Sequence, residues 1–258
     1  MAKVISSPCT AVVAALVVAG FGPGVLAAPI NYGDFNGNTV DFLQVTEDST
    51  SDPLPPALYG TPSVSGDSLD FNPISFNASA TGAAGADTTD GVLTMMMASH
   101  PGQFIDRIEF DEAGEFTLSG LTGNASVSVS ATFELDILEV DGIAIAPINI
   151  VTPMVFTPSG GDFDLISDGP GPLVNGIWSG QLMVDVRQAL IDQNIPFVNG
   201  ATKVSVSFDN TLTAQSEAGT SAFIAKKDVG GVGITVIPEP ASLMLMTAGG
   251  FCVLGRKR

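Results

Sequence analysis

Apolar and polar residues alternate along much of the chain. The alternation is clearest in residues 124–137, 178–186 and 203–214, where apolar side chains recur at nearly every second position. Because successive side chains of an extended chain point to opposite faces, these runs predict half-buried antiparallel strands. Residues 187–193 have a helical pattern instead. The two-residue period predicts shorter strands at 39–45, 91–97, 104–110, 115–121, 143–151, 220–225 and 232–237.

Turn-forming residues separate these runs, as at 112–114, 141–142 and 169–171. The chain has no internal repeat at a fixed spacing, which argues against a propeller or a solenoid. The pattern therefore predicts an all-β domain over residues 28–236: a single antiparallel β-sandwich, jelly-roll-like, with one short helix. The segment 49–73 contains five prolines, and we expect it to be a loop with a short edge strand.

The first 27 residues have the organisation of a secretory signal peptide. Lys3 provides a positive start, residues 11–20 (AVVAALVVAG) form an apolar core, and Val25-Leu26-Ala27 is a small-residue cleavage site. We expect Sec-type export and cleavage after Ala27, with Ala28 as the alternative. Residues 1–27 are thus predicted to be a targeting segment outside the folded domain.

The last 22 residues, 237–258, also look like a targeting segment. They contain a rigid Pro-Glu-Pro tripeptide at 238–240, an uncharged run at 241–255 and a basic end at 256–258. The uncharged run is short for a membrane span, which typically needs about 20 residues. The basic end would hold its side of the segment on the cytoplasmic face. The residues that define this pattern are Pro238, Glu239, Pro240, Arg256, Lys257 and Arg258.

This tail resembles the PEP-CTERM sorting signal, from which it departs in having Gly249-Gly250 inside the apolar run. The resemblance implies recognition by an exosortase, a membrane transpeptidase of bacteria that make extracellular polysaccharide. It also implies a transient inner-membrane anchor through the tail, and a final location at the cell surface or outside the cell. Residues 209–219 and 226–228 resemble segments of secreted PEP-CTERM proteins from Planctomycetes. An ordinary C-terminal membrane anchor is the alternative.

Cysteine use and charge narrow the expected chemistry. Cys9 and Cys252 both fall in the targeting segments, so the exported domain is expected to have no disulfide and no thiolate metal site. The predicted domain, residues 28–236, contains five basic residues and twenty-six acidic ones, a formal charge of −21. This charge excludes nucleic-acid binding and docking on anionic lipid through a basic patch. The membrane is expected to be a partner only through the tail, before processing.

Two segments contain residues of catalytic type, but neither has the motif or spacing of a known catalytic site. His100, the only histidine, lies in Ser-His-Pro-Gly, a sequence typical of a turn, and no G-x-S-x-G motif supplies a nucleophile. The segment from Glu109 to Glu115 partly resembles the E-x-D-x-x-E strand of sandwich-fold glycosidases. We expect Ala113-Gly114 to form a hairpin turn that separates these carboxylates. The sequence therefore predicts a protein that is not an enzyme, with glycoside hydrolase as a remote alternative.

Two groups of oxygen-bearing side chains are candidate Ca²⁺ ligands. The first begins like an EF-hand loop, although Gly37 falls at the fourth position and Val45 replaces the bidentate Glu. Oxygen ligands in an acidic exported domain favour Ca²⁺, and no other cofactor is expected. The first group is Asp34, Asn36, Asn38 and Asp41. The second group, in a Gly-rich loop, is Asp162, Asp164 and Asp168.

These features predict an exported surface or extracellular-matrix protein with a structural or adhesive role. The alternative is a carbohydrate-binding module, with or without Ca²⁺, whose partner would be an extracellular polysaccharide. Exposure of Trp178, Tyr32 or Tyr59 on one face would favour that alternative, because sugars stack on aromatic rings. Lys226 and Lys227 are expected to lie at a strand end beside carboxylates.

Overall fold

The computed structural model describes residues 28–52, 56–169, 171–227 and 232–238. Fifteen strands and one α-helix, with two short 3₁₀ turns at Gly82–Ala84 and Ser159–Gly161, make up this part of the chain. The elements are β1 (Ile30–Asn36), β2 (Val40–Asp48), β3 (Ser63–Ser65), β4 (Ser68–Phe71), β5 (Asn77–Thr81), β6 (Gly85–Ser99), β7 (Ile105–Gly120), β8 (Ala125–Val140), β9 (Ile143–Pro153), β10 (Val155–Thr157), β11 (Asp162–Asp164), β12 (Leu173–Asp185), α1 (Val186–Asp192), β13 (Ala201–Ser216), β14 (Thr220–Lys226) and β15 (Val232–Pro238).

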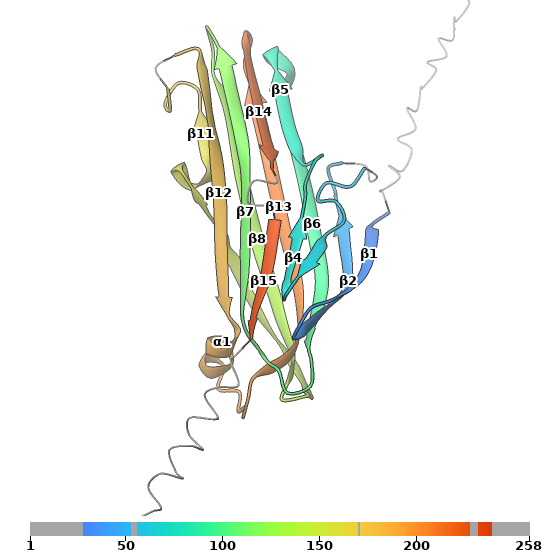
Figure 1. Cartoon of the computed structure of the whole chain (residues 1–258). Helices are drawn as coiled ribbons and strands as arrows, with labels where there is room; N and C mark the ends of the chain where they lie inside the picture. Colours follow the sequence, from blue (N-terminus) through green and yellow to red (C-terminus); the bar gives the residue numbers. More distant parts are fainter. Residues whose placement is uncertain (1–27, 53–55, 170, 228–231, 239–258) are drawn as a thin grey trace, which may run out of the picture.

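The strands form two facing layers, which we call sheet 1 and sheet 2 (Figure 1). Sheet 1 has the order β9-β8-β13-β6-β2-β1. In sheet 2, β12 pairs with β7, and β7 pairs along its length first with β15 and then with β14. β14 continues to β5, and β15 continues to β4 and β3. Every pairing between described strands is antiparallel, which confirms the predicted all-β sandwich.

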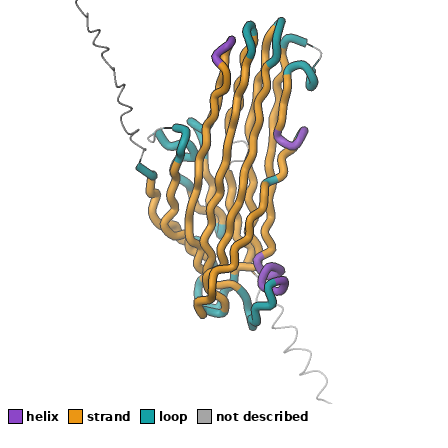
Figure 2. The backbone as a smooth tube through the Cα atoms, turned by 180° about the vertical axis from the view of Figure 1, so that it is seen from behind, coloured by secondary structure: helices purple, strands orange, loops and turns teal. Residues whose placement is uncertain are grey.

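The two layers meet at one end of the molecule, where Ala201 of β13 pairs with Ile105 of β7. Helix α1 lies at this end, which we call the α1 end (Figure 2). Asp185 caps the helix by accepting a hydrogen bond from the backbone N–H of Gln188. The sequence placed this helix one residue later than the structure does.

Alternate residues of the long strands fill the space between the layers. Along β7 and β13 the buried positions recur with a period of two, as expected from the sequence. The ring of Phe110 on β7 lies 4.6 Å from that of Phe133 and 5.1 Å from that of Phe208, across the sandwich. Burial of these apolar faces from both sheets is the main stabilising contribution.

One turn prediction is wrong: β7 runs unbroken through Ala113-Gly114. Gly114 serves a packing need instead of a turn. A methyl group there would lie 2.1 Å from the carbonyl oxygen of Ala225 and 2.4 Å from the Trp178 ring. The missing side chain therefore lets Trp178, on the neighbouring strand β12, cross directly over the β7 backbone.

The proline-rich segment 49–73 contains the short hairpin β3–β4 and also contributes to the core, which the sequence did not predict. Tyr59 is fully buried and donates its hydroxyl to the carbonyl oxygen of Gly91 (2.9 Å). The carboxylate of Glu47, itself buried, accepts the backbone N–H groups of Leu58 and Tyr59. These contacts fasten the segment to β2 and β6.

The strands β1, β5, β10 and β11 were not predicted, since they are short or lack clear alternation. β15 continues to Pro238, two residues beyond the expected domain boundary at 236. The expected cleavage site at Ala27 and the tail residues from Glu239 onward lie outside the described residues. In the part of the chain that is described, no helix has the length and apolar character of a membrane span.

Candidate functional sites

The first predicted Ca²⁺ group lies around the hairpin of β1 and β2. Asn36 and Asp41 are paired across it. The other members face different partners: Asp34 Oδ1 accepts the backbone N–H of Gln44 (2.8 Å), and the backbone N–H of Asn38 donates to Gly66 (3.1 Å). The carboxylates of Asp34 and Asp41 thus have separate hydrogen-bonding roles.

Asp41 instead faces His100, whose Nε2 lies 2.9 Å from Asp41 Oδ1. The hydrogen bond with this carboxylate raises the pKa of His100 above its ordinary value, and burial opposes the change only in part. The backbone N–H of His100 donates to the carbonyl oxygen of Thr39 (2.8 Å). The histidine therefore ties the turn after β6 to the start of β2, in agreement with the turn that the sequence predicts.

The second predicted Ca²⁺ group lies around a single pocket of about 380 Å³, lined by Asp162, Asp164 and Asp168. Asp164 Oδ1 accepts the backbone N–H groups of Ile166 and Ser167 (both 2.9 Å). Its Oδ2 accepts from the Asn124 side chain, and this bond lowers the pKa of Asp164. The Asp168 carboxylate accepts the backbone N–H of Asp164 (2.6 Å).

Within residues 28–52, 56–169, 171–227 and 232–238, no group of three or more His, Cys, Asp or Glu side chains is arranged to hold a metal ion. The structure brings the second group together around a pocket but employs two of its carboxylates in loop hydrogen bonds. Ca²⁺ binding therefore stays a prediction.

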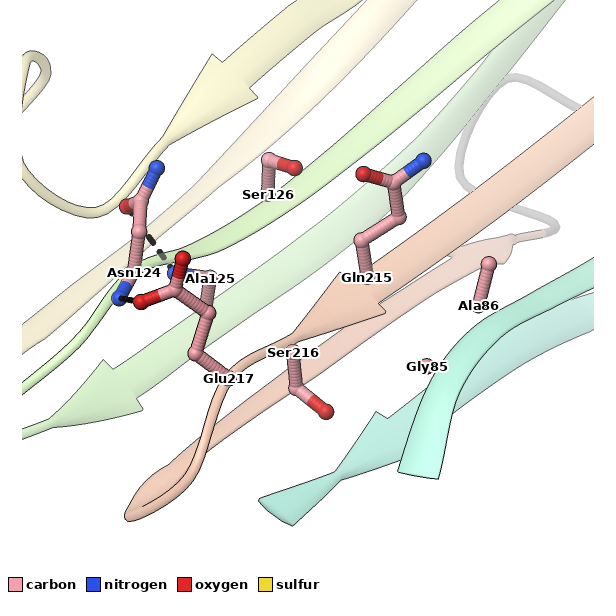
Figure 3. A pocket seen from close by; sticks show the side chains of 8 residues that line it. All are labelled: Gly85, Ala86, Asn124, Ala125, Ser126, Gln215, Ser216 and Glu217. Carbon is pink, nitrogen blue, oxygen red and sulfur yellow. Dashed lines mark hydrogen bonds between the residues drawn. The ribbon is translucent and has the colours of Figure 1, made fainter. Parts of the chain in front are cut away.

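A neighbouring pocket of about 320 Å³ lies at the end of the sandwich opposite α1, where Ser216 pairs with Gly85 and Ala125. Figure 3 shows this pocket from close by. Its lining comes from the start of β6, the start of β8 and the end of β13, and shares Ser126 and Gln215 with the acidic pocket. Glu217 Oε2 accepts the backbone N–H of Asn124 (2.8 Å), and a dashed line between these two residues marks this bond in Figure 3. Hydroxyl, amide and carboxylate groups thus line this end of the molecule.

The aromatic residues that would indicate sugar binding are not displayed on a face. Trp178 is 1% exposed and Tyr59 is fully buried. Tyr32 is half-buried and donates its hydroxyl to Glu47 Oε2 (2.5 Å). Burial and this hydrogen bond raise the pKa of Tyr32 well above its ordinary range. The stacking platform that would favour a carbohydrate-binding module is therefore not formed by these three rings.

The carboxylates between Glu109 and Glu115 divide between the two faces of β7. Glu109, Asp111 and Glu115 alternate with the buried positions, whereas Glu112 shares the core-facing phase and is buried. On the outer face, Lys227 Nζ lies 3.0 Å from Glu115 Oε1, as expected for a strand-end lysine beside a carboxylate.

Glu112 belongs to a buried polar cluster, which we define as Glu112, Asn210 and Lys226. Glu112 Oε2 accepts hydrogen bonds from both Lys226 Nζ and Asn210 Nδ2. The side chains of Glu112 and Lys226 have no exposed surface, and Asn210 is fully buried. Two members come from sheet 2, on β7 and β14, and Asn210 comes from β13 of sheet 1. The cluster thus bridges the layers.

Three aromatic rings surround Lys226 in this cluster and form its aromatic wall. Lys226 Nζ lies 5.0 Å from the ring centre of Phe76, 5.5 Å from that of Trp178 and 5.9 Å from that of Tyr59. Gly114 leaves space for Trp178. Gly91 does the same for the other two rings, since a methyl group there would lie 2.7 Å from Phe76 and 3.0 Å from Tyr59. Two glycines thus make room for the wall.

The cluster is incompletely hydrogen-bonded. Glu112 Oε1, Asn210 Oδ1 and Trp178 Nε1 are buried and have no hydrogen-bond partner. Burial lowers the pKa of Lys226, and the neighbouring Glu112 opposes this shift. Each buried polar atom without a hydrogen bond lowers the stability of the folded protein, so the presence of three of them needs an explanation.

Sequence reasoning missed this cluster although a signal was present. Asn210 stands in the core-facing phase between Phe208 and Leu212, and Lys226 continues the phase of Ile224. Glu112 follows the core-facing phase of Phe110, but the turn predicted at residues 112–114 excludes it from a strand.

The C-terminal segment, whose first residues lie in β15, is identified by comparison. Residues 236–258 match the family model of the PEP-CTERM protein-sorting motif. The chain carries a PEP-CTERM sorting motif. This motif implies export, anchoring through the C-terminal segment before processing, and processing by exosortase-type machinery. The match confirms the identification of the tail from its residues, whereas a Planctomycetes source stays a prediction.

The PEP-CTERM motif begins in the described part of the chain, at the α1 end. Val236 and Ile237 pair with Ile108 and Arg107 at the start of β7, and Pro238 pairs with Ile105. The two polar pockets lie at the opposite end, where Ser216 pairs with Gly85 and Ala125. The described start of the motif, residues 236–238, thus lies at the end of the sandwich opposite these pockets.

Comparison with curated proteins finds no match. Among solved structures, the enzymatically active domain of bacteriophage CBA120 tailspike protein 4 has 13% identity and a TM-score of 0.22, over 80% of this chain and 19% of that one. The chain thus spans about a fifth of the tailspike chain. TmCBM61 in complex with β-1,4-galactotriose has 8% identity and a TM-score of 0.19, over 75% of this chain and 82% of that one. At such TM-scores these likenesses establish neither a common fold nor a common function.

Proposed function

We propose that the mature protein is a non-enzymatic structural component of the cell surface or extracellular matrix, released or anchored after exosortase processing. The PEP-CTERM motif at residues 236–258 is the observation that carries this proposal. The signal-peptide pattern of residues 1–27 supplies the export step at the other end of the chain.

The sandwich supports a structural role in two ways. Its long strands, of up to 16 residues in β7, β8 and β13, form one elongated body (Figure 1). The ion pair of Glu112 and Lys226 is fully buried, so these two side chains do not contact an external substrate. The burial of Trp178 and Tyr59 disfavours the carbohydrate-binding alternative.

The proposal is tested by following the C-terminal peptide in a bacterium that has an exosortase. The full chain is compared with a variant in which residues 238–240 are all alanine, and with Pro101→Ala, an exposed proline outside the motif, as the matched control. Fractionation and mass spectrometry of the C-terminal peptide report location and processing.

We expect the wild type and Pro101→Ala to reach the surface or medium without residues 256–258. The alanine variant should keep those residues and stay in the membrane fraction. An intact wild-type tail in a cytoplasmic pool would refute the proposed sorting. Binding of the purified protein to a glycan array would favour the carbohydrate-binding alternative over a purely structural role.

A further inference from the structure

The geometry of the buried polar cluster brings an amine next to a carboxamide. Lys226 Nζ and Asn210 Nδ2 both donate to one oxygen atom, Glu112 Oε2, the second at 2.5 Å. The two nitrogens are therefore neighbours, and the carbonyl carbon of Asn210 is one bond from Nδ2. A primary amine and a carboxamide held together beside a carboxyl group are the reactants for an amide exchange.

The environment favours loss of charge in this cluster. An ammonium and a carboxylate are fully desolvated between Phe76, Trp178 and Tyr59, at a cost that their mutual attraction offsets only with complete hydrogen bonding. That condition is not met, because Glu112 Oε1 and Asn210 Oδ1 have no partners. Transfer of a proton from Lys226 to Glu112 would leave two neutral groups. A half-turn of the Asn210 amide would then present Oδ1 to the new carboxyl proton.

We propose that Lys226 and Asn210 form an intramolecular isopeptide bond, with Glu112 as the catalytic residue that transfers the protons. The bond would join β14 of sheet 2 to β13 of sheet 1 through the core. It goes beyond the proposed surface function and does not depend on sorting.

The reaction balances without any co-reactant. Glu112 first takes a proton from the Lys226 ammonium, which frees the lone pair of Nζ. Nζ attacks Cγ of Asn210 while the Glu112 carboxyl group hydrogen-bonds to Oδ1, where negative charge develops. Glu112 then accepts one proton from Nζ and delivers one to Nδ2.

The Cγ–Nδ2 bond breaks and ammonia leaves. One C–N bond has formed and one has broken, nothing is oxidised or reduced, and Glu112 ends as a neutral acid. The burial that lowers the pKa of Lys226 favours the nucleophilic amine, and the aromatic wall excludes the water that would otherwise compete as nucleophile.

Such a bond fits a chain whose sandwich contains no cysteine, since Cys9 and Cys252 both lie outside residues 28–238. An exported domain of this kind cannot be cross-linked by disulfides. An isopeptide bond between the facing sheets restricts the unfolded chain in the same manner as a disulfide.

Glu217 lies between Asn210 and Lys226 in the sequence, so cleavage of the chain after Glu217 separates these two residues unless a bond joins them. The full-length protein is purified, denatured and weighed by mass spectrometry, then cut after glutamate with a Glu-specific protease. We expect a mass lower than that of the same unmodified chain by one ammonia, and one branched product in which the peptides on either side of Glu217 stay joined. Two separate peptides would overturn the proposal, whatever the location of the protein in the cell.

Succinimide formation at Asn210 also releases one ammonia but joins no peptides, so it counts against the bond. Lys226→Arg and Asn210→Ala should give the unmodified linear peptides, and Glu112→Gln should abolish or strongly slow joining. Lys227→Ala is the matched control, because Lys227 forms the exposed pair with Glu115 on the other face of the sheet, and it should keep the branched product. Joining in Glu112→Gln at the wild-type rate would overturn the role of Glu112. If a core variant does not fold, the wild-type peptide map still decides.

Discussion

Replacing Glu47 with alanine should destabilise the sandwich severely, because this buried carboxylate fastens two segments to β2. Its oxygens accept hydrogen bonds from the backbone N–H groups of Leu58 and Tyr59 and from the hydroxyl of Tyr32. Alanine leaves both N–H groups unpaired in the interior, at about 1–3 kcal/mol each. Loss of the buried negative charge offsets part of this cost. We therefore expect a decrease of about 2–5 kcal/mol in the free energy of unfolding.

Two milder substitutions divide this effect. Tyr32→Phe removes a single half-buried hydrogen bond and should cost about 1 kcal/mol. Glu47→Gln keeps the side-chain volume and one acceptor oxygen, so it should fall between Tyr32→Phe and Glu47→Ala. Glu134→Ala is the control, because Glu134 lies on the outer face of β8 with one exposed hydrogen bond to Asn149, and should change stability by no more than about 0.5 kcal/mol.

Urea unfolding followed by the fluorescence of Trp178, the only tryptophan and a buried one, measures these differences. From the smallest to the largest loss of stability, the expected order is Glu134→Ala, Tyr32→Phe, Glu47→Gln and Glu47→Ala. A Glu47→Ala variant as stable as Glu134→Ala would show that the contacts of Glu47 do not hold the proline-rich segment in place.

Two further predictions concern packing and pH. Gly114→Ala should lower the melting temperature and cost about 1–3 kcal/mol or more, because its methyl group would overlap Trp178, whereas Gly233→Ala has open space and should be nearly neutral; equal effects would contradict the packing argument. His100 has a raised pKa in the folded protein, so its interaction with Asp41 stabilises the fold fully below the unfolded pKa of about 6.5 and less as pH rises through the folded pKa. Thermal melts from about pH 5 to about pH 9 should show this loss in the wild type and a flatter profile in Asp41→Asn, and parallel profiles would refute it.

The sequence alone determined the class of fold and the nature of the chain end. Period-two alternation is a local property, since it depends only on which face of a strand is buried, and it placed most of the long strands correctly. The tail was equally accessible, because a sorting motif consists of residues that are contiguous along the chain: Pro238-Glu239-Pro240, an apolar run and a basic end.

Glycine shows where local rules fail. The pair Ala113-Gly114 is typical of a turn. Only its packing against Trp178, which is far away in the sequence, shows that the strand continues. Tyr59 is similar: it stands in a proline-rich segment that is typical of a surface loop, yet it is buried because Glu47 and Gly91 supply its hydrogen bonds.

The contacts within the buried polar cluster were decided by tertiary structure. The phase of the strands places Asn210 and Lys226 on core-facing positions, but it does not indicate which groups they meet there. The contact of Glu112 and Lys226 with Asn210 requires that β7 and β14 lie side by side in one sheet. It also requires that β13 faces them from the other sheet. A pattern along the chain reports which face is buried, but the partner across the core is set by how the two sheets pack.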